Sequence, residues 1–259
     1  MNLKFILMSF FLTCFSVFET HAQLKSTSYK DGNQKLTGLS GIPTNPRTDI
    51  AGILILPAWK GIQSHEKEVA NQLTAMGYHT FVADIYGEGN YPTNSNEAGT
   101  IAGNYKKNVT EYQKRIHLAL DELIKGGAAK GRIVIIGYCF GGTGALEAAR
   151  SNMPVEGVVS FHGGLDRDTT SNIGLIKPRI LVCHGADDPY VGKKGVENFE
   201  VEMRAAKADW QMNIYANAVH AFTDKSAGND NSKGAAYNQK ADQRSWEDFM
   251  TFLKDVLGK

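Results

Sequence analysis

The fold is decided by the stretch Arg132-Ile-Val-Ile-Ile-Gly137-Tyr-Cys139-Phe-Gly141-Gly, which continues as Thr-Gly-Ala-Leu-Glu-Ala-Ala-Arg150. Its first part is an apolar run of strand length, and its last part is typical of a helix of small residues. The turn between them matches the nucleophile elbow G-x-S-x-G, with cysteine in the place of serine. Gly137 and Gly141 suit this turn because strand and helix nearly touch there. We therefore predict that Cys139 is a nucleophile. The alternative is a buried structural cysteine beside a glycine-rich turn.

The segments on either side alternate between strand-like runs and helical periodicity. Bare runs of Ile, Val and Leu without polar alternation are typical of strands buried on both faces. The sequence therefore predicts one α/β domain, with a mostly parallel sheet of about seven or eight strands between two helical layers. The expected strands are Gly52–Leu56, Thr80–Ala83, Arg132–Ile136, Val155–Phe161, Arg179–Cys183 and Gln211–Tyr215, and helical stripes are expected around Val69–Met76, Ile116–Leu123, Gly142–Arg150, Val196–Met203 and Trp246–Val256. In such a sheet, the chemistry is expected at the carboxyl ends of the strands.

An acid and a histidine follow two of these strands, in the order that this topology uses. Asp187 and Asp188 come directly after one strand, and His220 comes after the next. A cysteine needs a base or a positive neighbour to react at neutral pH. We expect His220 to exchange a proton with Cys139 and Asp187 to orient the imidazole. Spacing alone does not exclude Asp188 as the acid.

The oxyanion hole is expected to use two main-chain amides. One is that of Phe140, directly after the nucleophile, and the other is that of Trp59, after an earlier strand. The string Phe161-His162-Gly-Gly resembles an esterase oxyanion motif but follows the nucleophile, so we interpret it as a wall of the site. His162 is expected to touch the substrate or to line the wall. The other histidines of the mature chain, His65, His79, His117 and His184, are expected to be structural.

Composition excludes several classes of function. The chain has 259 residues, and its 28 Lys and Arg against 27 Asp and Glu give a net charge of +1. This balance offers no strong field for nucleic acid or an acidic membrane surface. No Cys or His pair has zinc-ligand spacing, so we expect no metal and no cofactor. Cys183 is expected two strands away from Cys139, about 9.6 Å at about 4.8 Å per strand, which is too far for a disulfide.

The N-terminus is typical of a secretory signal peptide. Lys4 precedes an apolar run of about fourteen residues, which is shorter than a membrane span, and Thr20-His-Ala22 suits a signal peptidase. We predict cleavage after Ala22, which removes Cys14, and a single domain over residues 23–259 in the periplasm or outside the cell. An uncleaved anchor is the alternative. We expect no membrane span after signal removal, and the sequence leaves a monomer or a weak homodimer open.

Seven motifs together resemble the dienelactone hydrolase (carboxymethylenebutenolidase-like) family of α/β-hydrolases over nearly all of the mature chain. They are Tyr29-Lys-Asp-Gly-Asn33, Leu36-Thr-Gly38, Pro57-Ala-Trp-Lys-Gly61, Ala83-Asp-Ile-Tyr-Gly87, Gly137-Tyr-Cys-Phe-Gly-Gly142, His184-Gly-Ala-Asp187 and His220-Ala-Phe222. The resemblance implies a three-layer α/β-hydrolase fold and a Cys139, His220 and Asp187 triad. It also implies hydrolysis of a carboxylic ester or lactone through a thioester intermediate.

Three departures from the family pattern bear on the substrate. Where family members that open dienelactone carry a glutamate that primes the cysteine, this chain has Ala58. Where they bind the substrate carboxylate with two arginines, the matching positions are Glu88 and Asp224. With Tyr86 and His162, these residues form the expected substrate pocket. Because both charges are reversed, we expect a neutral or cationic ester or lactone.

Two other functions are alternatives to the hydrolase. The first is a non-catalytic protein that binds a small molecule on this scaffold. The second is a thiol redox protein, which the absence of a C-x-x-C pair disfavours.

Overall fold

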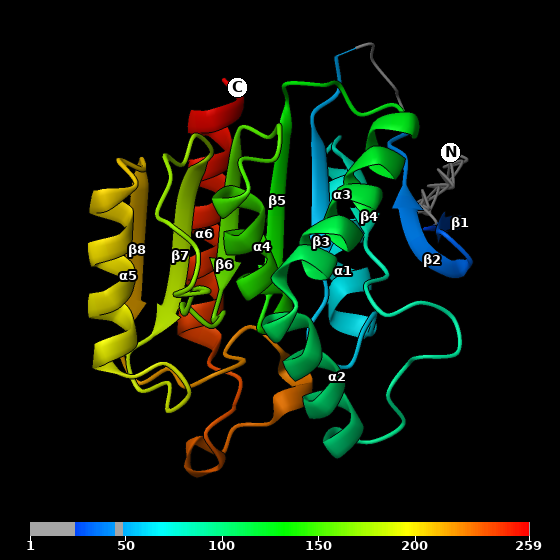
Figure 1. Ribbon diagram of the computed structural model, residues 1–259. Helices are drawn as coiled ribbons and strands as arrows, with labels where there is room; N and C mark the ends of the chain where they lie inside the picture. The colour runs from blue at the N-terminus through cyan, green and yellow to red at the C-terminus, as the bar shows by residue number, and fades with distance from the viewer. Residues whose placement is uncertain (1–23, 45–48, 259) are drawn as a thin grey trace, which may run out of the picture.

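The computed structural model describes residues 24–44 and 49–258, which form one eight-stranded sheet with helices on both faces (Figure 1). The strand order is β1-β2-β4-β3-β5-β6-β7-β8. All neighbours from β4 to β8 run parallel, and the β1–β2 and β2–β4 pairs are antiparallel. The predicted fold class is confirmed. The predicted signal peptide and Cys14 lie outside the described residues.

The central strands are apolar along their whole length because helices cover both of their faces. Every residue of β3, β4, β5 and β6 is buried. The strands are β1 (Lys25–Asp31), β2 (Gln34–Gly41), β3 (Gly52–Leu56), β4 (His79–Val82), β5 (Ile133–Tyr138), β6 (Gly157–Phe161), β7 (Arg179–Gly185) and β8 (Trp210–Tyr215).

The helices divide into two layers. Figure 1 shows α3, α4 and α5 in front of the sheet, and α1 and α6 behind it. Each layer closes its own apolar core against one face of the strands. The helices are α1 (Ser64–Ala75), α2 (Ser95–Lys107), α3 (Val109–Lys125), α4 (Phe140–Arg150), α5 (Lys193–Ala205) and α6 (Gln239–Leu257).

The sequence did not predict the hairpin β1–β2 or the helix α2. Two strands at the sheet edge have mixed polar and apolar faces, so their pattern is weaker than that of the central strands. Helix α2 buries only Ala98 and Ala102, and therefore carries almost no apolar stripe.

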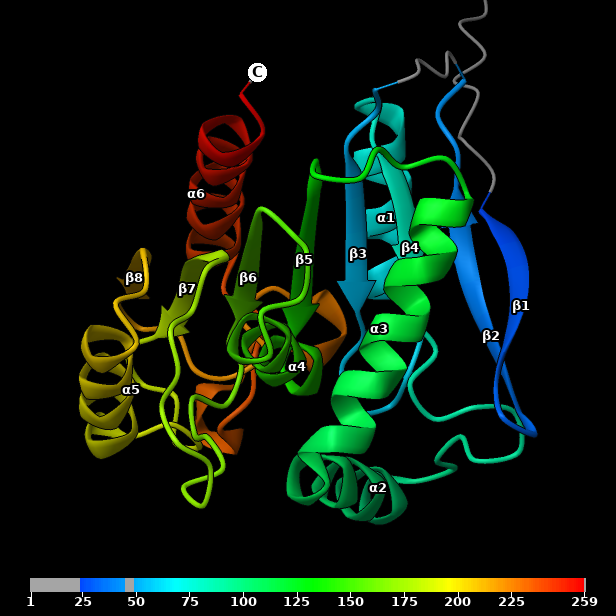
Figure 2. The same cartoon turned by 45° about the horizontal axis from the view of Figure 1, so that its top comes forward.

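The parallel strands end on one side of the molecule. Figure 2 shows their arrowheads pointing toward the side where α2 lies. Register pairs Leu56 at the end of β3 with Gly137 near the end of β5, so the segments that follow these two strands are neighbours. This edge of the sheet carries the candidate site. None of the helices in the described ranges is long and apolar enough to cross a membrane.

Candidate active site

Cys139 stands on a strained turn between β5 and α4. Its backbone has φ 54° and ψ −112°, in a region that residues other than glycine rarely adopt. A Cβ atom at Gly137 would lie 2.0 Å from the carbonyl oxygen of Gly141, and one at Gly141 would lie 2.1 Å from that of Leu56. Both positions therefore require glycine, and the turn has the geometry that the sequence predicted for a nucleophile elbow.

His220 lies between Cys139 and an aspartate. Its Nδ1 is 2.9 Å from Oδ2 of Asp188, and its ring lies beside the Cys139 thiol, whose pKa it lowers. The Asp188 side chain is fully buried, and its other oxygen accepts the N–H of Tyr190 at 2.8 Å. The histidine thus lies between the buried carboxylate and the thiol.

The prediction that Asp187 orients His220 is wrong. Asp187 is exposed, and its main-chain N–H donates to Ala218. The two aspartates follow each other in a tight turn after β7, so only one of their side chains can point inward. The sequence placed the acid in this turn, but the direction of each side chain depends on the turn geometry.

The electrostatics of the pair favour a thiolate and an imidazolium. Burial by itself would raise the pKa of Cys139, but the hydrogen bond and charge of His220, the charge of Lys106 and the Phe140 N–H outweigh burial and lower the pKa. Burial would likewise lower the pKa of His220, but its hydrogen bonds to Asp188 and Cys139 raise the pKa to about 9. Between these two pKa values, the sulfur carries the negative charge and the ring carries the positive one.

The two main-chain amides predicted for the oxyanion hole belong to Phe140 and Trp59. The Phe140 N–H begins α4 and points toward the Cys139 sulfur. Trp59 lies in the turn after β3, and the elbow touches this segment at Leu56 and Pro57. Within the described part of the chain, the Trp59 N–H donates to no other group. The Trp59 amide is therefore available to a substrate oxygen, and the Phe140 amide lies beside the sulfur.

His162 is buried and does not form an exposed wall of the substrate pocket, which differs from the expectation. It is only 2% exposed, and both ring nitrogens are occupied. Nδ1 accepts the Cys139 N–H at 3.2 Å, and Nε2 lies 2.9 Å from the hydroxyl of Thr223. Burial, with the charges of His220 and His65, lowers its pKa well below the ordinary value, so the ring is neutral. His162 therefore supports the main chain of the elbow.

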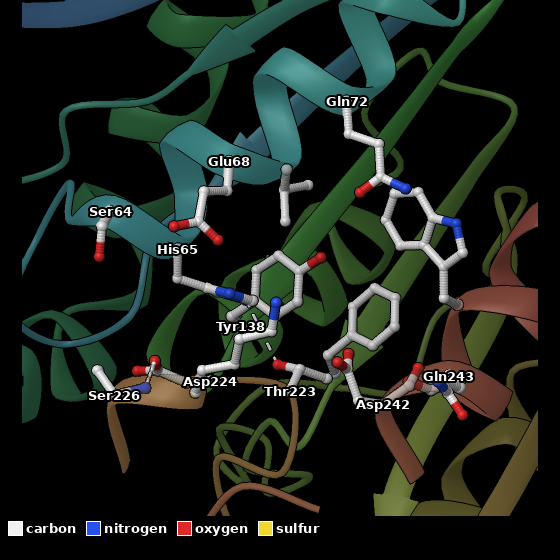
Figure 3. Close-up of a pocket in the computed structure, with 15 residues that line it drawn as sticks. Ser64, His65, Glu68, Gln72, Tyr138, Thr223, Asp224, Ser226, Asp242 and Gln243 are labelled. Atoms are coloured by element: carbon white, nitrogen blue, oxygen red, sulfur yellow. Dashed lines mark hydrogen bonds between the residues drawn. The ribbon is translucent and has the colours of Figure 1, made fainter. Parts of the chain in front are cut away.

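A separate pocket of about 260 Å³ lies between α1 and α6 (Figure 3). His65 projects into it from α1, 3.4 Å from the Thr223 hydroxyl, and packs edge-on against Tyr138. Asp224 also lines this pocket, and its side chain accepts the N–H of Ser226. Asp224 thus forms no hydrogen bond or ion pair with the predicted triad.

The other predicted pocket residues have separate roles. The Tyr86 hydroxyl donates to the carbonyl of Trp59 at 2.7 Å, and its ring stacks on Phe140. The Glu88 carboxylate contacts Lys35 at 2.9 Å and accepts the Thr37 hydroxyl at 2.6 Å, so its charge is neutralised.

The Ala58 N–H donates to the buried carboxylate of Glu66 at 3.1 Å. No carboxylate side chain stands at position 58 itself, as the sequence shows.

Cys183 is a free, fully buried thiol on β7. Strand β6 lies between β5 and β7, which separates Cys183 from Cys139 as predicted. Burial raises the pKa of Cys183 to about 12, so it stays protonated. In residues 24–44 and 49–258, no group of three or more His, Cys, Asp or Glu side chains could hold a metal ion.

The sequence analysis missed three residues around the site. Lys106 lies in the last turn of α2 and lines a cavity of about 450 Å³ together with Thr143 and Gly164. Tyr190 is 66% exposed and packs edge-on against His220. Glu66 is buried under the Trp59 turn. Only Glu66 had a sequence signal, because a carboxylate three residues after a helix cap is typical of a capping box.

Comparison with known proteins decides the family. The model of the dienelactone hydrolase family matches residues 36–257. The chain belongs to the dienelactone hydrolase family. It is therefore a hydrolase of the ester or lactone type.

Individual members of the family support this assignment. A dienelactone hydrolase-like promiscuous phosphotriesterase from metagenomic libraries is 31% identical, and the match covers 90% of this chain and 98% of that chain with a TM-score of 0.85. A probable 2-oxo-3-(5-oxofuran-2-ylidene)propanoate lactonase of Bradyrhizobium is 26% identical over 215 residues, which are 79% of this chain and 84% of the relative. A putative carboxymethylenebutenolidase of Salmonella typhimurium is 22% identical over 219 residues, 80% of this chain and 78% of the relative.

Proposed function

We propose that this hydrolase acts through a Cys139–His220–Asp188 triad. The observation that supports it most directly is the position of His220, which bonds the buried Asp188 on one side and lies beside the Cys139 thiol on the other. The strained elbow, the Phe140 amide beside the sulfur and the unpaired Trp59 amide are consistent with acyl transfer.

In this mechanism, the Cys139 thiolate attacks the carbonyl carbon of the ester. The carbonyl oxygen becomes an oxyanion and accepts the N–H groups of Phe140 and Trp59. When the C–O bond breaks, protonated His220 gives its proton to the leaving alkoxide, and a thioester remains. A water molecule then attacks the thioester while neutral His220 takes the proton of that water. The product acid leaves, the sulfur regains its electron pair as a thiolate, and Asp188 stabilises the imidazolium throughout.

The test combines p-nitrophenyl acetate hydrolysis with iodoacetamide labelling. Cys139→Ala should lose turnover, whereas Cys183→Ala should retain it, and labelling should modify Cys139 alone. Mass spectrometry of the quenched reaction should find one acetyl group on Cys139. Turnover that survives Cys139→Ala refutes the triad. Selective labelling without turnover of any ester would instead favour the non-catalytic binding protein.

For the substrate, we propose a neutral ester or lactone. The charges of Glu88 and Asp224 repel an anionic substrate less than the sequence suggested, because Lys35 pairs with Glu88 and Asp224 faces the pocket beside α1. What supports the proposal is that neither position holds an arginine to bind a carboxylate. Lys106 argues the other way, since its positive charge acts on the thiol and no described residue pairs with it. A carboxylated dienelactone should be hydrolysed more slowly than a neutral aryl ester of similar size, and a strong preference for the carboxylate would refute the proposal.

We also propose that the protein is exported. The support is the sequence of residues 1–22 alone. Expression of the full chain in a bacterium, followed by fractionation and N-terminal sequencing, should give a periplasmic or secreted protein beginning at Gln23. A cytosolic protein that keeps Lys4 would contradict this.

A further inference from the structure

Glu66 is a buried carboxylate at the beginning of α1. It is 1% exposed, and none of the described cationic side chains pairs with it. Its Oε1 accepts the N–H of Ala58 at 3.1 Å, and its Oε2 accepts that of Gln63 at 2.9 Å. A buried carboxylate is costly unless it is well hydrogen-bonded, and here two amides and the helix N-terminus stabilise it. The two oxygens thus tie together both ends of the turn at residues 58–63.

The same turn is held from its other side. The Tyr86 hydroxyl donates to the Trp59 carbonyl at 2.7 Å, and the Gly61 N–H donates to the Ala58 carbonyl at 2.9 Å. The peptide group that carries the Trp59 N–H therefore lies between two held groups, the Ala58 N–H bonded by Glu66 and the Trp59 carbonyl bonded by Tyr86. The Trp59 N–H itself has no partner in the described chain. A peptide fixed in this way can be aimed at a substrate oxygen before the reaction begins.

We propose that Glu66 is a positioning residue that aims the Trp59 amide into the oxyanion hole. This inference rests on the proposed function, because it assigns Trp59 as an oxyanion donor. Helix capping alone would need only the bond from Glu66 to Gln63. The second bond, to Ala58, reaches across the turn to the residue just before Trp59. That bond restrains the direction of the next peptide group.

The decisive test compares acyl transfer with alkylation in Glu66→Gln. Glutamine keeps one oxygen acceptor but turns an N–H₂ group toward the second amide, so the turn loses one of its two bonds. Ester hydrolysis develops an oxyanion, whereas alkylation of the thiolate by iodoacetamide does not. The kcat for p-nitrophenyl acetate should fall about 10- to 100-fold with KM within about twofold, which is less than full loss of a donor at about 10²- to 10³-fold. The rate of Cys139 alkylation should remain within about twofold of the parent rate, and its pH profile should be unchanged.

Two further variants make the result specific. Glu68→Gln removes a carboxylate two residues away on the exposed surface of the same helix, and it should leave both rates unchanged. Tyr86→Phe removes the hydrogen bond to Trp59 and keeps the ring, so it should lower kcat in the same selective way even if Glu66→Gln folds poorly. Thermal unfolding of each variant shows which of them are folded at the assay temperature.

The outcomes separate this inference from the proposed function. If folded Glu66→Gln and Tyr86→Phe both hydrolyse the ester at the parent rate, the inference is wrong while the triad stands. If hydrolysis and alkylation fall together, Glu66 supports the whole site and the specific role is also wrong. If the parent protein hydrolyses esters without needing Cys139, the proposed function itself fails.

Discussion

Replacing Asp188 with asparagine removes the charge beside His220 and preserves the shape of the side chain. The carboxylate is fully buried and lies 2.9 Å from Nδ1 of the histidine. Its neighbour Asp187 is exposed and provides a matched control, because Asp187→Asn removes the same charge one residue away.

The structure sets the expected size of the loss. A hydrogen bond to a charged group contributes about 1.5–3 kcal/mol, which corresponds to about 10- to 150-fold in rate. If the asparagine also fixes the wrong imidazole tautomer, the loss approaches about 10⁴-fold, as in a serine triad. Asp188→Asn should therefore lower kcat/KM at least about tenfold, and Asp187→Asn should stay within about twofold of the parent.

The pH profile gives a second, independent readout. In the parent, activity should rise with pH through the lowered pKa of Cys139 and fall as His220 loses its proton near its pKa of about 9. Without the bond to Asp188, the pKa of His220 falls, so the alkaline limb should move to lower pH. Steady-state hydrolysis of p-nitrophenyl acetate across the pH range measures both effects. Equal losses in the two variants, or a larger loss in Asp187→Asn, would refute the assignment of the acid.

Three other predictions follow from the same geometry. Gly141→Ala should destabilise the fold by about 1–3 kcal/mol or more and abolish hydrolysis, because its Cβ would lie 2.1 Å from a main-chain carbonyl oxygen. Gly174→Ala is the control: open space surrounds Gly174, so the denaturant midpoint should change little. Cys183→Ala should leave native iodoacetamide labelling at one equivalent by intact mass, and a second labelled thiol in the folded parent would contradict its burial. Lys106→Met should raise the pKa of Cys139, measured from alkylation rates across a pH series. Because Lys106 is exposed, this difference in pKa should shrink at 1 M salt. An unchanged pKa would show that the Lys106 charge does not reach the sulfur.

The sequence predicted the central sheet well because its strands are buried on both faces. A strand such as β3 has no polar alternation to obscure it, and its predicted bounds agree with the structure. The edge hairpin and α2 escaped prediction for the opposite reason, since neither has a strong apolar pattern. The loop segments that follow the strands, where most of the site lies, carry even less periodic information.

The sequence by itself determined the elbow at Cys139, because Gly137 and Gly141 are the residues that a strained turn requires, and it named Cys139 and His220 as the residues now proposed for catalysis. Only the tertiary structure decided which of two adjacent aspartates faces His220, since that depends on how the turn after β7 directs each side chain. It also decided that His162 supports the elbow from behind and that Glu66 braces the Trp59 turn. These roles depend on directions and distances between residues far apart in the chain, which spacing along the sequence does not contain.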